Sequence, residues 1–248
     1  MITGDYHTHT IYSHGKGTIL ENALEAKRVG LKELAITDHG FGHLFFAVKR
    51  DKLDEMREKI NEAEAETGLK ILLGLEANFV STKGDVDINE KDLSKLDILL
   101  VGHHRFVKSS FKDKFIHFLP NMIFGKKAPK CVVKRNTETI LKAMEKYPID
   151  IITHLTYQMP LDVRKIAKKA KETKTYIELN TTKLCLTQKE LDILIEEKVD
   201  FIINSDAHTP KKVGKVQPAL EFAKKFNIPK TRIANLDKIP TFKKFQKK

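Results

Sequence analysis

Short apolar runs alternate with longer amphipathic stretches along this chain of 248 residues. Seven of the short runs have the length and the β-branched or leucine-rich character of buried strands. They span residues 1–7, 32–39, 69–76, 96–104, 149–154, 175–180 and 199–208. Helical patterns lie at residues 18–30, 50–68, 136–148, 160–174, 187–198 and 217–227. This alternation predicts an α/β fold with a parallel sheet that is buried on both faces.

Local signals support several of these elements. Thr18 precedes the first helical pattern and Gly30 follows it, while Thr187 stands three residues before Glu190 as in a capping box. Only residues 105–135 do not follow this alternation of strand and helix. The stretch is long, basic and rich in phenylalanine. We expect a single domain over residues 1–248, with an irregular insertion at about 105–135.

Composition narrows the class of protein. The hydrophobic fraction of 41% is that of a globular chain, and no apolar run approaches the roughly 18 residues of a membrane helix. The first residues lack the layout of a signal peptide, so we expect a cytoplasmic protein without a membrane partner. The two cysteines, Cys131 and Cys185, are too few for a disulfide framework.

The net charge of +12 is compatible with binding to nucleic acid, because basic proteins attract polyanions. The lysines, however, are spread along the predicted helices and often stand beside glutamates. Charge that is spread in this way is typical of a solvated surface. The charge therefore leaves a nucleic-acid partner possible without favouring it.

Candidate metal ligands gather where the predicted strands end. In a parallel α/β barrel these carboxyl ends converge on one face, where active sites lie. The residues at or just past such ends are His7, His9, His14, His39, Glu76, His103, His104, His154, Asp206 and His208. Histidines scattered at random would also populate the helices, so this distribution indicates a site. Glu178 and Asn180 end the sixth strand but are not obvious ligands, and His43 and His117 receive no role.

Imidazole and carboxylate groups suit divalent ions such as zinc, manganese or iron. Nine ligands, with His103 and His104 counted as one position, exceed the three or four of one catalytic zinc. The sequence therefore predicts two or three ions, with Glu76 able to bridge a pair. Three dications would leave a charge of about +4 after Glu76 and Asp206 are counted, so the centre would hold an anion. Such a centre lowers the pKa of bound water and can clamp a phosphoryl group.

These residues lie in motifs that resemble those of the polymerase and histidinol phosphatase (PHP) family. The motifs are "DYHTHT" with "SHG", then "TDHG", "GHHRF" with the later "THL", and "SDAH", with "GLEAN" resembling the family's glutamate segment. The resemblance covers about residues 5–208 and is closest to the stand-alone phosphatase branch. It implies a distorted seven-stranded TIM-like (β/α) barrel whose trinuclear centre hydrolyses phosphate esters by attack of a metal-bridging hydroxide.

Carried over by position, the resemblance implies nine ligands: His7, His9, His14, His39, Glu76, His104, His154, Asp206 and His208. His104 is preferred to His103 because of its spacing from Asp97. Glu76 would bridge two of three divalent ions. His7, His9 and Asp206 would complete the first of this pair, and His104 and His154 the second. The third ion would be held by His14, His39 and His208. No catalytic residue separate from these ligands is implied.

Four further residues are expected near the centre. Arg105 and Lys183 follow the fourth and sixth strands, where a cation could bind the substrate phosphate. Asp38 is expected to support its neighbours rather than bind metal, because strand alternation points it away from His39. Asp5 shares the face of His7 but lies deeper, so we expect it to support the ligands.

The favoured function is therefore a metal-dependent phosphatase acting on a small phosphorylated metabolite, of which histidinol phosphate is one candidate. An alternative is a phosphodiesterase or exonuclease on nucleic acid. Lysines bind the phosphates of a nucleic-acid backbone, and its bases stack on aromatic rings such as those of residues 105–135. The absence of an attached polymerase module in this sequence argues against it. A non-catalytic metal-binding module is disfavoured because all nine ligand positions are filled.

Overall fold

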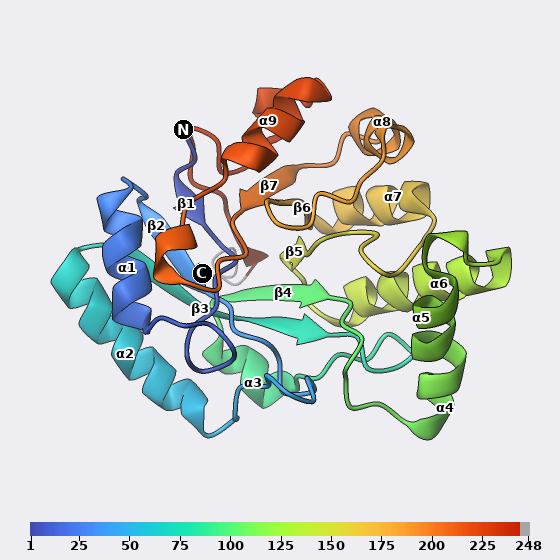
Figure 1. Ribbon diagram of the computed structural model, residues 1–248, viewed down its shortest axis with the longest axis horizontal. Coiled ribbons are helices and arrows are strands. Elements are labelled where there is room, and N and C mark those ends of the chain that lie inside the picture. Colours follow the sequence, from blue (N-terminus) through green and yellow to red (C-terminus); the bar gives the residue numbers. More distant parts are fainter. Residues whose placement is uncertain (244–248) are drawn as a thin grey trace.

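The computed structural model describes residues 1–243 and has seven parallel strands enclosed by helices (Figure 1). Strands that follow one another in the chain are neighbours in the sheet, in the order β1 to β7. The strands are β1 (Gly4–Asp5), β2 (Glu33–Ile36), β3 (Lys70–Asn78), β4 (Ile98–Gly102), β5 (Ile151–Ile152), β6 (Tyr176–Asn180) and β7 (Phe201–Asn204). The predicted seven-stranded TIM-like barrel is confirmed.

Helices cover the outside of the sheet (Figure 1). They are α1 (Ile19–Arg28), α2 (Lys52–Thr67), α3 (Glu90–Lys95), α4 (Phe111–Asp113), α5 (Leu119–Phe124), α6 (Lys130–Lys146), α7 (Val163–Thr173), α8 (Gln188–Glu196) and α9 (Gln217–Lys225). The predicted capping boxes at Thr18 and Thr187 are both present. None of the helices in residues 1–243 combines the length and the apolar character that a bilayer crossing requires.

Two apolar cores stabilise the barrel. The larger one fills the layer between strands and helices, where Leu73, Leu75 and Ala77 of β3 face outward. The smaller one fills the barrel interior, where Leu72 packs with Tyr6 and with residues of the other strands. The alternation along β3 therefore turns Glu76 toward the interior, four residues beyond Leu72. This places a carboxylate at the upper end of a packed barrel.

Backbone hydrogen bonds and one buried side chain close the seam between the first and last strands. Beyond β1, Thr8 forms a parallel bridge with Ala207, and the backbone N–H of His9 donates to the Ala207 carbonyl at 2.8 Å. Lower in the seam, the buried Asn235 amide donates to the carbonyls of Gly4 and Ile203 and accepts from the Ile203 N–H. The amide replaces the ladder bonds that the short β1 does not supply.

Asn235→Ala is expected to lower the free energy of unfolding by about 3 kcal/mol, because it leaves two buried carbonyls and one N–H with one partner fewer. Urea unfolding followed by circular dichroism measures the change. The control is Asn61→Ala, which removes an exposed amide from α2. Equal unfolding midpoints for the two variants would show that the seam does not depend on Asn235.

The stretch that was expected to be an irregular insertion is mostly helical. Ser110 caps α4, a π-helical turn spans Lys114–Phe118, and α5 and a 3₁₀ turn at Gly125–Lys127 follow. Helix α6 begins at Lys130, six residues before the start that the hydrophobic pattern predicted. Helix α3 was not predicted, since six residues carry too little periodicity for detection, although Asn89 and Asp92 form a capping box there.

Candidate metal centre

Histidine and carboxylate side chains meet at the carboxyl end of the barrel. The residues that were expected there come from β3 and from the segments that follow β1, β2, β4, β5 and β7. Close approach is possible because β4 ends in Gly102, where a Cβ would lie 2.3 Å from the Thr153 hydroxyl and 3.1 Å from Glu76 Oε1. A side chain at this position would displace Glu76 or its neighbours.

The Glu76 carboxylate lies in the middle of the histidine side chains. This fully buried carboxylate has five imidazoles within 3.7 Å: His39 at 3.1 Å, His7 and His104 at 3.4 Å and His9 at 3.7 Å from Oε2, and His154 at 2.9 Å from Oε1. Burial alone would raise the pKa of Glu76, but the surrounding imidazoles, His104 and His7 first, hold it well below its ordinary value. The carboxylate is therefore an anion that faces nitrogen ligands on several sides.

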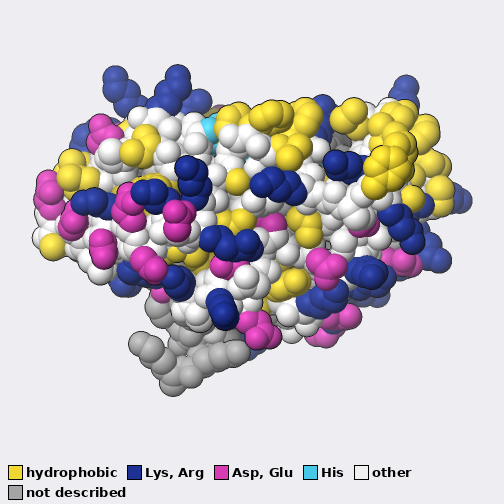
Figure 2. All heavy atoms as spheres, turned by 90° about the horizontal axis from the view of Figure 1, so that it is seen from below, with side chains coloured by type: hydrophobic (Ala, Val, Ile, Leu, Met, Phe, Trp, Pro, Cys, Tyr) yellow, Lys and Arg dark blue, Asp and Glu magenta, His cyan; other side chains and the backbone are white. Residues whose placement is uncertain are grey.

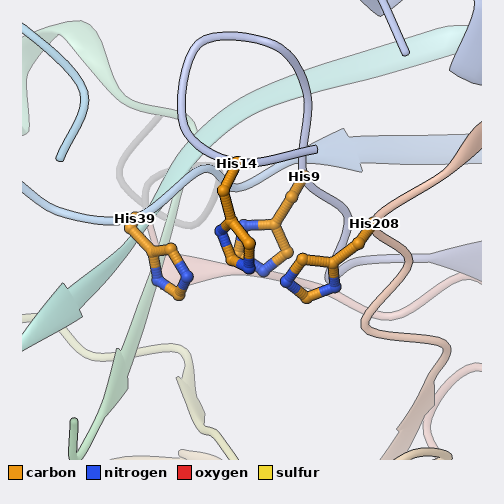
Figure 3. Close-up of side chains that lie close together, drawn as sticks. All are labelled: His9, His14, His39 and His208. Atoms are coloured by element: carbon orange, nitrogen blue, oxygen red, sulfur yellow. The ribbon is translucent and has the colours of Figure 1, made fainter. Parts of the chain in front are cut away.

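A second group consists of four imidazoles that point toward one another, from His9, His14, His39 and His208 (Figure 3). One ring nitrogen of each lies within 4.8 Å of the others. Burial, together with neighbouring imidazoles, lowers the pKa of His14 to about 3, and burial lowers that of His39 to about 4. These two rings are neutral at pH 7, which is the form that binds metal.

Asp206 connects the centre to β6. Its Oδ1 lies 3.3 Å from His9 Nε2 and 3.6 Å from His7 Nε2, while its Oδ2 accepts hydrogen bonds from Lys183 Nζ at 2.5 Å and from Asn180 Nδ2 at 3.0 Å. Its backbone has the left-handed φ of 53°. Because Oδ2 is held by these donors, Oδ1 is turned toward the imidazoles.

Glu178 is a functional residue that sequence reasoning passed over. Its Oε1 lies 2.7 Å from His7 Nδ1, and its Oε2 accepts from the backbone N–H of His154 at 2.9 Å. A carboxylate on Nδ1 fixes the ring so that Nε2 faces Glu76 and Asp206. Asn78 does the same for His104, with its Oδ1 2.7 Å from Nδ1. Alternation along β6, which puts residue 178 on the inward face, was the available signal.

The donor set fits divalent cations. Several of its buried atoms have no hydrogen-bond partner: His9 Nδ1, His14 Nδ1, His39 Nδ1, Glu76 Oε2, His104 Nε2 and Asp206 Oδ1. Buried polar atoms are normally satisfied, and leaving them without partners is unfavourable. Imidazole nitrogens together with carboxylate oxygens are the ligands that zinc, manganese and iron accept. Bound cations would supply the missing partners for the atoms that face the centre.

Of the other residues expected near the centre, two support the segments that carry ligands and one lies at the surface. Asp38 accepts from the backbone and hydroxyl of Thr10 and from the Ser13 hydroxyl, which fixes the loop that carries His14. Asp5 accepts from Ser205 and Gly214 and so supports the segment around Asp206. Arg105 is exposed.

Three histidines fall outside the expected set of ligands. The His103 ring stacks on Phe118 and lies 5.5 Å from His117, so it is His104 that faces Glu76. His43, to which no role was given, stacks on His39 with 4.9 Å between ring centroids. It therefore lies at the edge of the centre.

Comparisons with known proteins give a matching family model, related sequences and solved structures of similar fold. The PHP domain model matches residues 5–182. A "probable phosphatase" of Thermoanaerobacter sp. strain X514 is 32% identical over 94% of this chain and 90% of that protein. A solved chain from Listeria monocytogenes has a TM-score of 0.62 at 18% identity, covering 86% of this chain and 97% of its own. Histidinol phosphate phosphatase from Lactococcus lactis, solved with zinc, L-histidinol and phosphate, has a TM-score of 0.61 at 17% identity, covering 90% and 93%.

Proposed function

The chain belongs to the PHP domain family and is a metal-dependent phosphatase, and on that premise we propose that it hydrolyses phosphate monoesters of a small metabolite. The observation that carries the proposal is the buried Glu76 carboxylate, with five imidazole nitrogens within 3.7 Å and an unpartnered Oε2. A phosphate dianion is the kind of substrate that a strongly cationic loaded centre would attract.

We assign three divalent ions to the centre, drawn from zinc, manganese and iron. Three groups of side chains support this number: His7, His9 and Glu76; His39, Glu76 and His104; and His9, His14, His39 and His208. His154 and Asp206, from the segments that follow β5 and β7, complete the proposed ligand set. Zinc, phosphate and L-histidinol in the Lactococcus lactis protein of the same fold are in line with this assignment.

The chemistry divides between the ions and the protein. When bound, the ions supply an activated water and neutralise charge on the phosphate oxygens. Glu178 and Asn78 orient His7 and His104, and Asn180 holds one oxygen of Asp206. Burial would lower the pKa of Lys183, but Asp206 raises it to about 12, so this side chain remains a cation. With 23% of its side chain exposed, Lys183 can meet a phosphate oxygen at the surface of the centre.

Lys183→Ala is expected to lower kcat/KM for a phosphate monoester by about 100-fold, since a charge-assisted hydrogen bond to phosphate is lost. The exposed Arg105 is proposed as a second phosphate contact, and Arg105→Ala is expected to have a smaller effect. Steady-state kinetics measure both, with metal content determined for each variant because Lys183 also holds Asp206. The control is Lys70→Ala at the amino end of β3. Unchanged kcat/KM in Lys183→Ala with full metal content would remove Lys183 from the proposal.

The function itself is tested on protein purified without chelators. Metals per chain are counted by elemental analysis, and p-nitrophenyl phosphate and its bis ester are assayed in parallel with manganese, zinc or cobalt. We expect two to three ions and monoester turnover that His9→Ala abolishes. A preference for the diester would instead support the alternative function on nucleic acid, with which the net charge of +12 is compatible. Full metal occupancy without either activity would contradict a phosphoesterase.

A further inference from the structure

Exposed hydrophobic side chains stand at the mouth of the candidate metal centre. Leu44, Phe45, Phe46 and Phe106 expose 49%, 69%, 40% and 51% of their surface, and we refer to these four as the aromatic wall. On the face shown in Figure 2, hydrophobic side chains gather along one edge with lysine and arginine among them. Contiguous exposed apolar surface with a polar rim is typical of a binding site.

The aromatic wall is fixed by backbone hydrogen bonds between two loops. The Leu44 N–H donates to the Phe106 carbonyl at 2.9 Å, His43 and Val107 form an antiparallel bridge, and the Lys108 N–H donates to Gly42 at 2.7 Å. The partly buried Asp87 carboxylate accepts a hydrogen bond from the Gly42 N–H at 2.7 Å. The wall is therefore already formed in the free protein, which favours binding because little ordering is needed.

The rings of the wall are continuous with the centre. Phe46 stacks on His14 with 4.4 Å between ring centroids, and it lies 5.1 Å from His43. Phe45 lies 6.2 Å from Phe46 and 5.5 Å from Phe106. A molecule whose phosphate reaches the histidine cluster therefore has its remaining atoms near these rings.

The charges around the wall restrict what it can bind. Residues 40–48 and 103–108, which form it, contain no aspartate or glutamate, while Arg105 and Lys108 are exposed cations. An ammonium group would therefore find no carboxylate on these loops. Hydrocarbon, and aromatic rings above all, would contact the phenylalanines edge to face or offset.

We propose that the aromatic wall binds the alcohol part of the substrate, and that this part is apolar and carries no positive charge. The inference rests on the proposed monoesterase function and adds the class of ester. It differs from an amino alcohol such as L-histidinol, which the Lactococcus lactis protein holds. Phe45 and Phe106 are the specificity residues in this proposal. They contact each other, whereas Phe46 stacks on the proposed ligand His14.

Binding of non-hydrolysable phosphonates to the metal-loaded protein, measured by calorimetry, tests the proposal without turnover. We expect 2-phenylethylphosphonate to bind on the order of tenfold more tightly than methylphosphonate. Phe45→Ala and Phe106→Ala should reduce this ratio several-fold and leave the affinity for inorganic phosphate unchanged. The control is Phe124→Ala, which removes a phenylalanine of similar exposure from the end of α5 and should preserve the ratio.

Kinetics with matched leaving groups provide the second readout. The kcat/KM for 2-phenylethyl phosphate should exceed that for L-histidinol phosphate, and the preference should fall in Phe45→Ala and Phe106→Ala through KM. Equal affinities for the two phosphonates, or a preference for L-histidinol phosphate, would overturn the inference while leaving the phosphatase intact. If inorganic phosphate does not bind and no monoester is hydrolysed, the proposed function fails instead.

Discussion

Glu76→Gln is expected to lower kcat/KM for p-nitrophenyl phosphate at least about a thousandfold and to remove one or two metal ions per chain. The Glu76 Oε2 atom lies 3.1 to 3.7 Å from nitrogens of four histidines, and the side chain is fully buried. An amide has the same shape but no negative charge, and its NH₂ group cannot bind a cation. The loss should therefore appear in metal content and in activity together.

Elemental analysis, steady-state kinetics and circular dichroism on the same preparation separate loss of metal from loss of fold. The matched control is Glu33→Gln, since the Glu33 carboxylate accepts from the Tyr6 hydroxyl at the amino end of β2, away from the centre. This variant should keep its metal and its activity. Wild-type metal content and activity in Glu76→Gln would contradict the role given to Glu76 as the bridging ligand.

The position of Glu76 could be predicted because two simple rules act together. Side chains alternate along a strand, and the carboxyl ends of parallel strands meet on one face of a barrel. The long β3 follows both rules, with Leu72 inside the barrel and Glu76 four residues later at its end. The rules also brought His7, His9, His39 and His154 to the correct face, although β1 and β5 contain only two residues each.

The supporting contacts were harder to predict because they depend on packing between distant segments. Glu178 lies 171 residues from His7, and a glutamate on an inward strand position does not reveal whether it contacts metal or a ligand. His43 reaches the centre because its loop pairs with Val107, which no local pattern indicates. The helices between Phe111 and Phe124 are short and include a π-helical turn, so their apolar positions do not follow one period.

Removing the metal is expected to destabilise the protein as well as inactivate it. Glu76, Glu178 and Asp206 are three buried carboxylates. Burial would lower the pKa of His7, but these three carboxylates raise it well above its ordinary value. Without cations, the negative charge of these carboxylates is balanced by the protonated His7 ring and by Lys183, which pairs with Asp206. Each ion that binds only the folded state adds about 4 kcal/mol when its concentration is a thousand times its Kd.

For a chain of this size each kcal/mol shifts the melting temperature by roughly 2–4 °C, so complete chelation should lower it by about 10 °C or more. Calorimetry before and after dialysis against a chelator measures the shift, and added zinc or manganese should restore both stability and activity. Glu76→Gln is the informative control, because a variant that has already lost one or two of its ions should lose correspondingly less stability on chelation. A melting temperature that stays constant while elemental analysis shows the metal to be gone would mean that the barrel tolerates its buried charges unaided, and the unpartnered Glu76 and Asp206 oxygens would then need another explanation.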